Sequence, residues 1–341
     1  MSFPILTNTV AVADSNLLNL TLAYSASHRA RYLGQPQPAT RIADWVRDVF
    51  PALRLALHDP HLRITDGHLA TAVMLLSLKI ISPNTFEVPI PWQSHLSLAR
   101  DLFQANLDNM LYSANRIGAF LARWLGYIDI MGALSYRNSG PPLDSYYSVI
   151  EACSTHTEND DLSVDCFTGF SQRTGTALIE LGKLVHHTDR EQIQIDTTPC
   201  NWKPSVNAVL GTEALVAEFE TLRTKSHVDH KHCGGASPTD LIAMDQAFCC
   251  AALLHLQRRV LNRHPSSTAV HGALNGLTQA MSHMEPGGSA EVGAVFPLFT
   301  AGCEAQDHNQ RMEMLNRLTA LEKTGMKQVS LSSSHIMVCS D

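Results

Sequence analysis

The sequence lacks the motifs by which most enzymes and metal-binding domains are recognised. Its eight cysteines include no C-x-x-C pair, so the chain encodes neither a thiolate zinc site nor a dense disulfide framework. It also has no G-x-S-x-G, G-x-x-x-x-G-K or G-x-G-x-x-G segment, so hydrolase, nucleotide-binding and dinucleotide-binding functions have no anchor. We therefore predict a protein that is not an enzyme and holds no cofactor, and we assign no catalytic, cofactor-binding or metal-ligating residue.

The chain has few charged residues, and its net charge is negative, whereas proteins that bind nucleic acid carry basic surfaces. Charged residues make up 17% of the chain, and 32 Asp and Glu against 25 Lys and Arg give a net charge of −7. Nucleic-acid binding draws its affinity from basic side chains that neutralise phosphates, so we expect no direct DNA binding by this chain alone. The low charge also leaves little polar surface for a helix-rich monomer. We therefore expect protein partners to cover part of the exterior.

No segment predicts a membrane or secretory protein. Residues 1–14 place no basic segment ahead of an apolar run, as a signal peptide would. The most apolar stretch, Leu69–Ile81, is interrupted by Thr71, Ser77 and Lys79 and is shorter than the ~20 apolar residues that a spanning helix needs. We expect an intracellular protein in a reducing compartment, with no membrane contact.

Hydrophobic residues, at 45% of the chain, recur mainly at helical spacing. Ser15–Leu33 predicts a complete helix that Gly34 terminates. A second pattern begins at Thr40, and Pro51 lies inside it, so this helix is predicted to kink or split. Further helices are predicted at residues 66–81, 92–105, 114–134, 171–187, 205–224, 239–262, 267–284, 290–305 and 309–324. No strand pattern competes, so the predicted fold class is all-α, an irregular multi-helix bundle or layered helical domain with polar loops.

The predicted domain organisation is a single helical domain. It covers residues 15–331, between an N-terminal tail at residues 1–14 and a C-terminal tail at residues 332–341. A mobile loop is predicted at about residues 137–165, because a Gly-Pro-Pro sequence breaks the helical pattern there. The acidic, polar run Thr155–Asp161 follows, and it has too little apolar surface to order itself alone.

Asp160, Asp161 and Asp165 carry the sharpest enzymatic alternative. Carboxylates at this spacing on a helix suit magnesium bound to a diphosphate, as in the magnesium-dependent all-α terpene synthases. Such an enzyme needs a second metal motif, N-D-x-x-S-x-x-x-E, which the sequence lacks. The aromatic content of 6% is also low for a pocket that stabilises carbocations. An acidic, solvated loop is the favoured interpretation of these residues.

A second metal hypothesis falls on His227, His230, His232 and Cys233, since imidazole and thiolate are zinc ligands. Structural zinc sites usually take another ligand pair from a distant segment, so a flexible surface loop is the favoured interpretation. Cys249-Cys250 lies in the middle of a predicted helix on an apolar face. We expect these two thiols to pack in the core, where free cysteine behaves as a small hydrophobe.

Several stretches, taken in order, resemble the fungal-specific transcription factor domain, the helical region that follows the zinc cluster in fungal regulators. The resemblance is carried by Leu17–Arg31, Leu69–Leu78, Ile90–Leu96, Ala99-Arg100, Asp165–Phe170, His255–Leu261, Phe296–Ala305 and Gly325–Val329. It covers nearly the whole chain, and its order makes it more specific than any single block. Within one block, Glu304 is expected to accept the fork of an arginine such as Arg311.

The resemblance implies a transcriptional regulator, with a regulatory or effector domain that acts through protein-protein contacts and controls a metabolic gene set. It implies a homo- or hetero-dimer or contacts with coregulators, allows a small-molecule effector, and implies a location in the nucleus, with the cytoplasm as the second compartment. It transfers no catalytic residue. The zinc-cluster DNA-binding module, with six closely spaced cysteines and a basic run, is not found in this chain, whose first cysteine is Cys153. A purely structural partner or a gene remnant is the remaining alternative.

Overall fold

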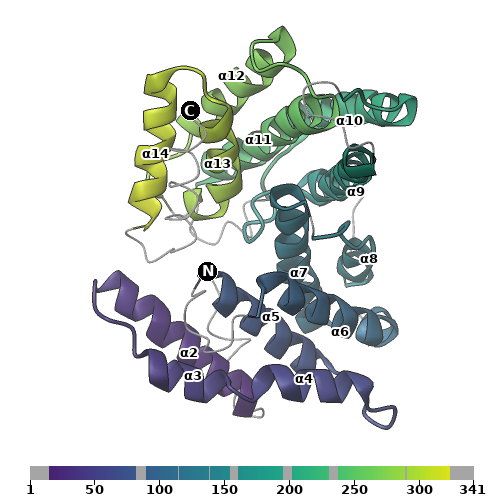
Figure 1. Ribbon diagram of the computed structural model, residues 1–341, viewed down its shortest axis with the longest axis vertical. Coiled ribbons are helices and arrows are strands. Elements are labelled where there is room, and N and C mark those ends of the chain that lie inside the picture. Colours follow the sequence, from purple (N-terminus) through teal and green to yellow (C-terminus); the bar gives the residue numbers. More distant parts are fainter. Residues whose placement is uncertain are drawn as a thin grey trace. The chain divides into compact units, whose positions relative to one another are not determined.

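A computed structural model describes residues 15–81, 90–113, 115–137, 139–153, 160–194, 202–229, 237–288 and 290–322. Within these ranges the chain is all-α, as predicted (Figure 1). The only β pairing there consists of two isolated bridges, Ser163 with His227 and Val164 with Ser171. Helices of one chain joined by short connections therefore build the described fold.

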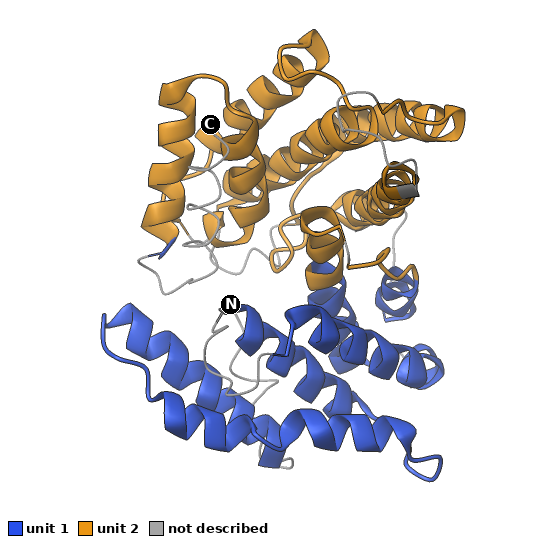
Figure 2. Ribbon diagram, viewed as in Figure 1, with its two compact units in different colours: residues 1–127, 145–155, 322–328 blue, residues 128–144, 156–321, 329–341 orange. Residues whose placement is uncertain are grey.

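The chain forms two compact units (Figure 2). Unit 1 comprises residues 1–127, 145–155 and 322–328, and unit 2 comprises residues 128–144, 156–321 and 329–341. Each unit has its own set of buried helices.

Unit 1 is organised around one helix that is apolar nearly all round. Its helices are α2 (Ser15–Tyr32), α3 (Ala39–Val46), α4 (Val49–His58), α5 (Asp66–Ile81), α6 (Trp92–Ser113), the first part of α7 (Arg116–Ser135), and α8 (Ser145–Ala152). Helix α5 packs against α2, α4 and α6. Leu69, Val73 and Leu78 in α5 are fully buried, as expected of a helix with apolar residues nearly all round.

Two local signals at the start of unit 1 act as predicted. Gly34 takes a left-handed φ of +64°, and the Gln35 amide donates to the Ala30 carbonyl (2.7 Å), which closes the end of α2. The predicted split near Pro51 is also present, because α3 ends at Val46 and α4 begins at Val49. A proline clashes with the carbonyl four residues before it, here that of Arg47, which lies in the break.

Unit 2 surrounds another apolar helix. Its elements are η1 (Asp160–Leu162), α9 (Gln172–Gln194), α10 (Val206–Lys225), α11 (Pro238–His255), η4 (Leu256–Val260), α12 (Thr268–Ser282), η5 (Glu291–Ala294), α13 (Val295–Glu304) and α14 (His308–Glu322). Helix α11 packs against α9, α10, α12 and α13. Twelve of its eighteen residues are buried, so it forms the core of this unit.

Among the residues that the structure describes, two helices are long and apolar enough to cross a membrane by length and composition alone. They are Arg116–Ser135 and Pro238–Val260. Of their most apolar windows, 67% and 72% is buried inside the protein. Buried core helices of soluble proteins pass the same test, and this burial accounts for the apolar composition of both segments.

A helix lies within the predicted mobile loop of residues 137–165. Helix α8 places Tyr146 in the core at 1% exposure. The Tyr146 ring lies 4.8 Å from that of Phe103, and a Cβ on Gly126 would lie 3.1 Å from the tyrosine Cγ. Helix α8 was not predicted, because its apolar positions follow a run of helix breakers and their partners are distant in sequence. Most of the polar run Thr155–Asp161 lies outside the described residues.

Replacing Tyr146 with alanine should destabilise the protein. The substitution removes a fully buried ring and leaves a cavity beside Phe103, at a cost of about 3–5 kcal/mol. Thermal unfolding followed by circular dichroism measures the effect as a lowered midpoint. Tyr112→Ala is the matched control, because Tyr112 is 94% exposed and its loss should change stability by about 0.5 kcal/mol or less. Equal midpoints for the two variants would contradict the packing of α8.

Candidate functional site

Helix α11 brings three of the sequence blocks together inside unit 2. Phe170 meets Phe248 edge to face at 5.0 Å between ring centroids. Phe248 in turn stacks on Phe296 at 6.2 Å, and Phe296 stacks on His255 at 5.2 Å with an interplanar angle of 14°. We call these four rings the block junction. Residues more than a hundred positions apart thus meet in one aromatic column, which stabilises the unit beyond simple burial.

A tight turn positions the first of these rings. The Asp165 carboxylate accepts hydrogen bonds from the amides of Phe167 (2.9 Å) and Thr168 (3.0 Å), an arrangement by which aspartate stabilises turns. Gly169 then adopts a φ of +79°, and a Cβ there would lie 2.0 Å from Met244 Cε. Only glycine fits that position. Asp165 therefore acts as a turn former.

A π-helical turn follows α11 at η4. The Leu261 amide donates to the Leu256 carbonyl, five residues back, at 3.0 Å. This turn accommodates one residue more than an α-helical turn, and such turns are frequent at functional sites. It carries Arg258 and Arg259, and each of them reaches a carboxylate on a different helix.

Arg259 binds the more deeply buried carboxylate. It donates from Nη2 to Asp189 Oδ2 (2.6 Å) and from Nε to Asp189 Oδ1 (3.3 Å), a two-point fork that favours arginine over lysine. The Asp189 side chain is 2% exposed and that of Arg259 15%. Arg259 also donates to the Leu134 carbonyl (2.5 Å). Arg137 adds a second cation 3.8 Å from Asp189. The end of α11 is therefore tied to α9 and to residues near the end of α7.

Arg258 joins the same turn to α13. Its Nε donates to Glu304 Oε2 at 2.7 Å, and both side chains are less than a third exposed. Glu304 therefore accepts an arginine, as the sequence predicted. The partner that the structure gives is Arg258, whereas Arg311 donates to the Ala305 carbonyl (2.6 Å).

His255 closes the block junction at the end of α11. Its Nε2 lies 3.4 Å from the Thr300 hydroxyl. Burial lowers the pKa of His255 to about 3, and the nearby positive charge of Arg259 adds to the shift. The ring is therefore neutral at physiological pH and serves as a packing residue.

A buried carboxylate lies one turn below the aromatic column. Asp245 is fully buried and accepts hydrogen bonds from the Ser171 amide (2.8 Å) and the Ser226 hydroxyl. Burial raises the pKa of Asp245, and these hydrogen bonds oppose the rise. Burial also raises the pKa of the thiols of Cys249 and Cys250, which are 0% and 1% exposed. This agrees with the predicted packing role, since reactive cysteines have lowered pKa values.

The other residues of the metal hypotheses are described only in part. Asp161 lies 3.9 Å from Arg173, and nothing is described of the Asp160 side chain. His227 pairs through its backbone, donating to Leu162 (3.3 Å) and accepting from Val164 (2.8 Å). His230, His232 and Cys233 lie outside the described residues. Among the residues that the structure describes, no group of three or more His, Cys, Asp or Glu side chains is placed to hold a metal ion.

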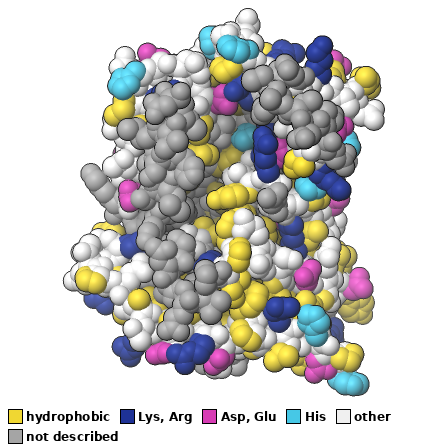
Figure 3. All heavy atoms as spheres, viewed as in Figure 1, with side chains coloured by type: hydrophobic (Ala, Val, Ile, Leu, Met, Phe, Trp, Pro, Cys, Tyr) yellow, Lys and Arg dark blue, Asp and Glu magenta, His cyan; other side chains and the backbone are white. Residues whose placement is uncertain are grey.

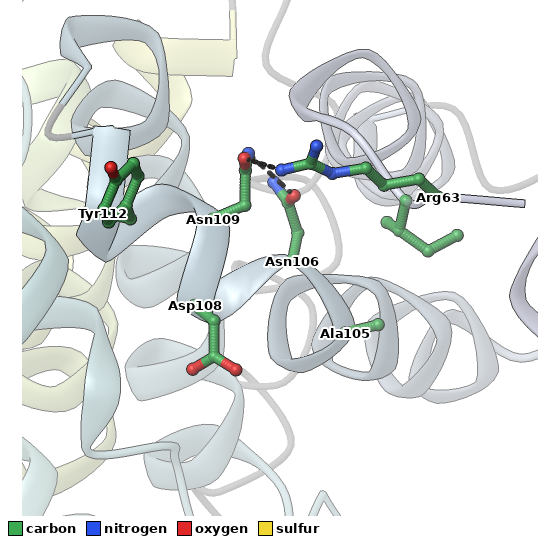
Figure 4. A pocket seen from close by; sticks show the side chains of 7 residues that line it. Arg63, Ala105, Asn106, Asp108, Asn109 and Tyr112 are labelled. Atoms are coloured by element: carbon green, nitrogen blue, oxygen red, sulfur yellow. Dashed lines mark hydrogen bonds between the residues drawn. The ribbon is translucent and has the colours of Figure 1, made fainter.

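Unit 1 has a shallow pocket, which sequence reasoning missed. It measures about 480 Å³ and is lined by Arg63, Ile64, Ala105, Asn106, Asp108, Asn109 and Tyr112. Arg63, just before α5, donates to the Asn109 side chain, which in turn donates to Asn106 (3.3 Å) (Figure 4). Asn106 donates to Asp66 at the start of α5 (2.7 Å). Asp108 points away from this chain of hydrogen bonds. The polar groups on the pocket wall thus tie α5 to α6.

The face drawn in Figure 3 shows no continuous basic patch among the described residues. On the face drawn in Figure 3, Lys and Arg side chains of the described residues stand in small separate groups, with acidic and hydrophobic side chains between them. A nucleic-acid footprint is a continuous basic patch or stripe. The acidic balance of the chain, with its net charge of −7, is consistent with this distribution.

Removing the carboxylate of Asp189 should be strongly destabilising. Asp189→Ala leaves the largely buried guanidinium of Arg259 without its partner, which costs about 3–5 kcal/mol. Denaturant unfolding measures the loss. Asp44→Ala breaks the exposed pair of Asp44 with Arg47 and serves as the control, with an expected change below about 1 kcal/mol. A small effect of Asp189→Ala would show that the π-turn is held by other contacts.

Stability should fall as the pH drops from about 6.5 toward 3. His255 and His95 have folded pKa values of about 3 and about 4, below the value of 6.5 for an unperturbed histidine. In both cases burial is the main cause. At pH values between the folded and the unfolded pKa of each histidine, the unfolded chain binds a proton that the folded chain does not. Each histidine should therefore lower the free energy of unfolding by roughly 1–2 kcal/mol by pH 5.

The titration can be assigned to one residue by substitution. His255→Phe should flatten the pH dependence of the unfolding free energy, because phenylalanine keeps the stacking on Phe296 and has no proton to bind. His61→Gln, at an exposed position, should leave the pH dependence unchanged. An unaltered slope in His255→Phe would argue against a buried neutral ring.

Sequence comparison identifies the family to which these blocks belong. A family model described as the fungal specific transcription factor domain matches residues 4–335. No curated protein and no solved structure matches the chain. The matched region covers all but the first three residues of unit 1 and the last six of unit 2, and it includes every residue of the block junction and the π-turn. The chain therefore belongs to the fungal specific transcription factor domain family.

Proposed function

We propose that this chain regulates transcription through protein-protein contacts and does not bind DNA by itself. The single observation that carries the proposal is the family match over residues 4–335. The chemistry of the described residues supports it, because the two arginines of the π-turn are engaged in internal ion pairs. Asp189, Arg259, Arg258 and Glu304 hold helices together. They therefore serve as a scaffold for a surface and not as a reaction centre.

The charge distribution supports a regulator that relies on another DNA reader. Counterion release by basic side chains supplies most of the affinity in nucleic-acid binding. A net charge of −7 opposes that attraction. We infer that the protein works in the nucleus beside a DNA-binding partner, as a dimer or with coregulators, and that its targets form a metabolic gene set.

Fusing the chain to a DNA-binding domain from another protein tests the proposal. The full chain fused to a heterologous DNA-binding domain should change the expression of a reporter gene severalfold, because contacts with the transcription machinery no longer depend on a natural partner. The DNA-binding domain alone is the control. Asp161→Ala is a second control, because it removes only a long surface ion pair with Arg173 and should leave the reporter response intact.

A second measurement tests the absence of DNA binding. The purified chain should give no sequence-specific mobility shift with duplex DNA at physiological salt. Tight, salt-sensitive binding of the chain alone would contradict the proposal, as would a fusion protein that leaves the reporter unchanged.

A further inference from the structure

The connection from η4 to α12, residues 261–267, carries an exposed serine three residues after an exposed arginine. The two residues are Arg263 and Ser266, and His264 between them is exposed as well. Arginine-directed serine/threonine kinases select this spacing, because acidic groups in their substrate cleft pair with the guanidinium. A motif of this length also recurs by chance, so its structural context decides which copy is accessible.

The R-x-x-S/T spacing occurs three times in the sequence, ending at Thr176, Ser226 and Ser266. Thr176 lies within α9, and its hydroxyl donates to the Gln172 carbonyl (3.1 Å). The Ser226 hydroxyl is hydrogen-bonded to Asp245, whose carboxylate is fully buried. A phosphate on Ser226 would therefore lie against a second negative charge. Because kinases bind their substrates as extended segments, the fold protects both of these hydroxyls.

Ser266 differs from the other two hydroxyls because it lies at the tip of a turn. The Ser267 amide donates to the His264 carbonyl (3.0 Å), so Pro265 and Ser266 are the central residues, and proline favours the first of these positions. The Ser266 hydroxyl lies 2.7 Å from His264 Nδ1. Ser267 is already extended, with φ −70° and ψ 146°. Opening the single backbone hydrogen bond across the turn therefore presents Arg263 through Ser267 as an extended segment.

The chain around this turn has no acidic residue. Residues 246–284 contain neither Asp nor Glu, although the whole chain has 32 of them. The same segment contains Arg258, Arg259 and Arg263, and Arg258 donates to the Arg263 carbonyl, which fixes the start of the connection to η4. The first turn of α12 has no acidic side chain. A phosphate on Ser266 therefore meets the positive end of the α12 dipole and no carboxylate from its own segment.

We propose that Ser266 is a phosphorylation site for an arginine-directed serine/threonine kinase, and that the native fold accepts the phosphate at the start of α12. In the transfer, the Ser266 oxygen forms a bond to the γ-phosphorus of ATP held by the kinase. The bond from that phosphorus to the β–γ bridging oxygen breaks, ADP leaves, and the serine proton passes to a base of the kinase. The product carries about two negative charges. This inference goes beyond the proposed function and does not depend on it.

Incubation of the purified full chain with an arginine-directed kinase, ATP and Mg²⁺ tests the proposal. Mass spectrometry of fragment ions should locate one phosphate per chain, at Ser266. Arg263→Ala should lower the initial rate about tenfold or more, because the kinase loses a charged hydrogen-bond partner. The substitution leaves the backbone carbonyl that Arg258 binds. Arg190→Ala is the matched control, because Arg190 is exposed and Ile193 stands where the motif needs a hydroxyl. Its rate should equal that of the wild type.

Two hydroxyl substitutions test the choice of site. Ser266→Ala should remove nearly all of the incorporated phosphate, whereas Thr176→Ala should leave the amount unchanged. Circular dichroism establishes that each variant is folded. A folded chain that takes up no phosphate, a phosphate located at Thr176 or Ser226, or incorporation that survives Ser266→Ala would each overturn the proposal. Equal rates for Arg263→Ala and the wild type would also overturn it.

Thermal unfolding tests whether the native fold accepts the phosphate. The phosphorylated chain should unfold at a midpoint about 1–3 °C higher than the unmodified chain at low salt, because the new charge lies beside the positive end of α12. Salt at about 0.5 M should reduce this gain by screening. Ser266→Ala treated with the kinase is the control and should show no change. A lower midpoint after phosphorylation would overturn the placement of the phosphate at the start of α12.

The phosphorylation proposal and the proposed function can fail separately. Phosphate transfer is measured on the purified chain, and the reporter response is measured on the fusion protein. If the fusion protein leaves the reporter unchanged while Ser266 is modified, the proposed function fails and the modification site stands. If the fusion protein regulates the reporter and Ser266 takes up no phosphate, only the modification site is wrong.

Discussion

Burial of α11 on all sides is the constraint on which unit 2 depends. Helix α11 is surrounded by α9, α10, α12 and α13, so each of its buried polar groups needs a hydrogen-bond partner. A buried polar group without a partner destabilises the fold by more than one hydrogen bond stabilises it. Asp245 meets this demand with the Ser171 amide and the Ser226 hydroxyl. Beyond the end of α11, the two arginines of the π-turn are satisfied by carboxylates on other helices. Arg259 pairs with Asp189 on α9, and Arg258 pairs with Glu304 on α13. The same side chains that remove the polar groups from water thus define how the helices are joined.

Unit 1 solves the same problem with weaker interactions. Its central helix, α5, is largely apolar. The helix buries one lysine, Lys79, and this burial lowers the pKa of the lysine. His95 packs edge-on against Phe50 at 4.7 Å. At the other end of α5, amide side chains and Arg63 form a chain of hydrogen bonds toward α6 (Figure 4).

Local features of the chain were predictable from the sequence. The end of α2 at Gly34, the break before Pro51 and the burial of α5 each depend on residues within one or two turns of each other, and periodicity or backbone chemistry records them directly. The turn that presents Phe170 was seen only as part of a sequence block. Its aspartate was read both as a possible ligand and as part of a solvated loop, because the amides that Asp165 accepts from become visible only once the backbone is folded.

Long-range pairing was not predictable. Arg311 was the expected partner of Glu304 because it is seven residues away, whereas Arg258 lies 46 positions earlier and reaches it only through the packing of α11 on α13. Asp189 and Arg259 are 70 residues apart, and nothing in the sequence joins them. Helix α8 was missed for a similar reason, since Tyr146 is held by Phe103 and Gly126 on other helices. Hydrophobic spacing identifies which face of a helix is buried, but it does not identify the neighbour.

The π-turn η4 sets the directions in which its two arginine side chains leave the helix. An α-helix advances about 100° per residue, so the additional residue of η4 rotates the two arginines relative to the buried face of α11. Adjacent side chains on a helix point about 100° apart, so Arg258 and Arg259 leave the turn toward different helices, and the additional residue sets the direction of both. Loss of a single residue here would swing both guanidinium groups through roughly a quarter turn, and neither carboxylate would then lie along its path. The length of this segment is consequently as tightly constrained as its composition, and insertions or deletions in the family should be accommodated in the loops on either side of it.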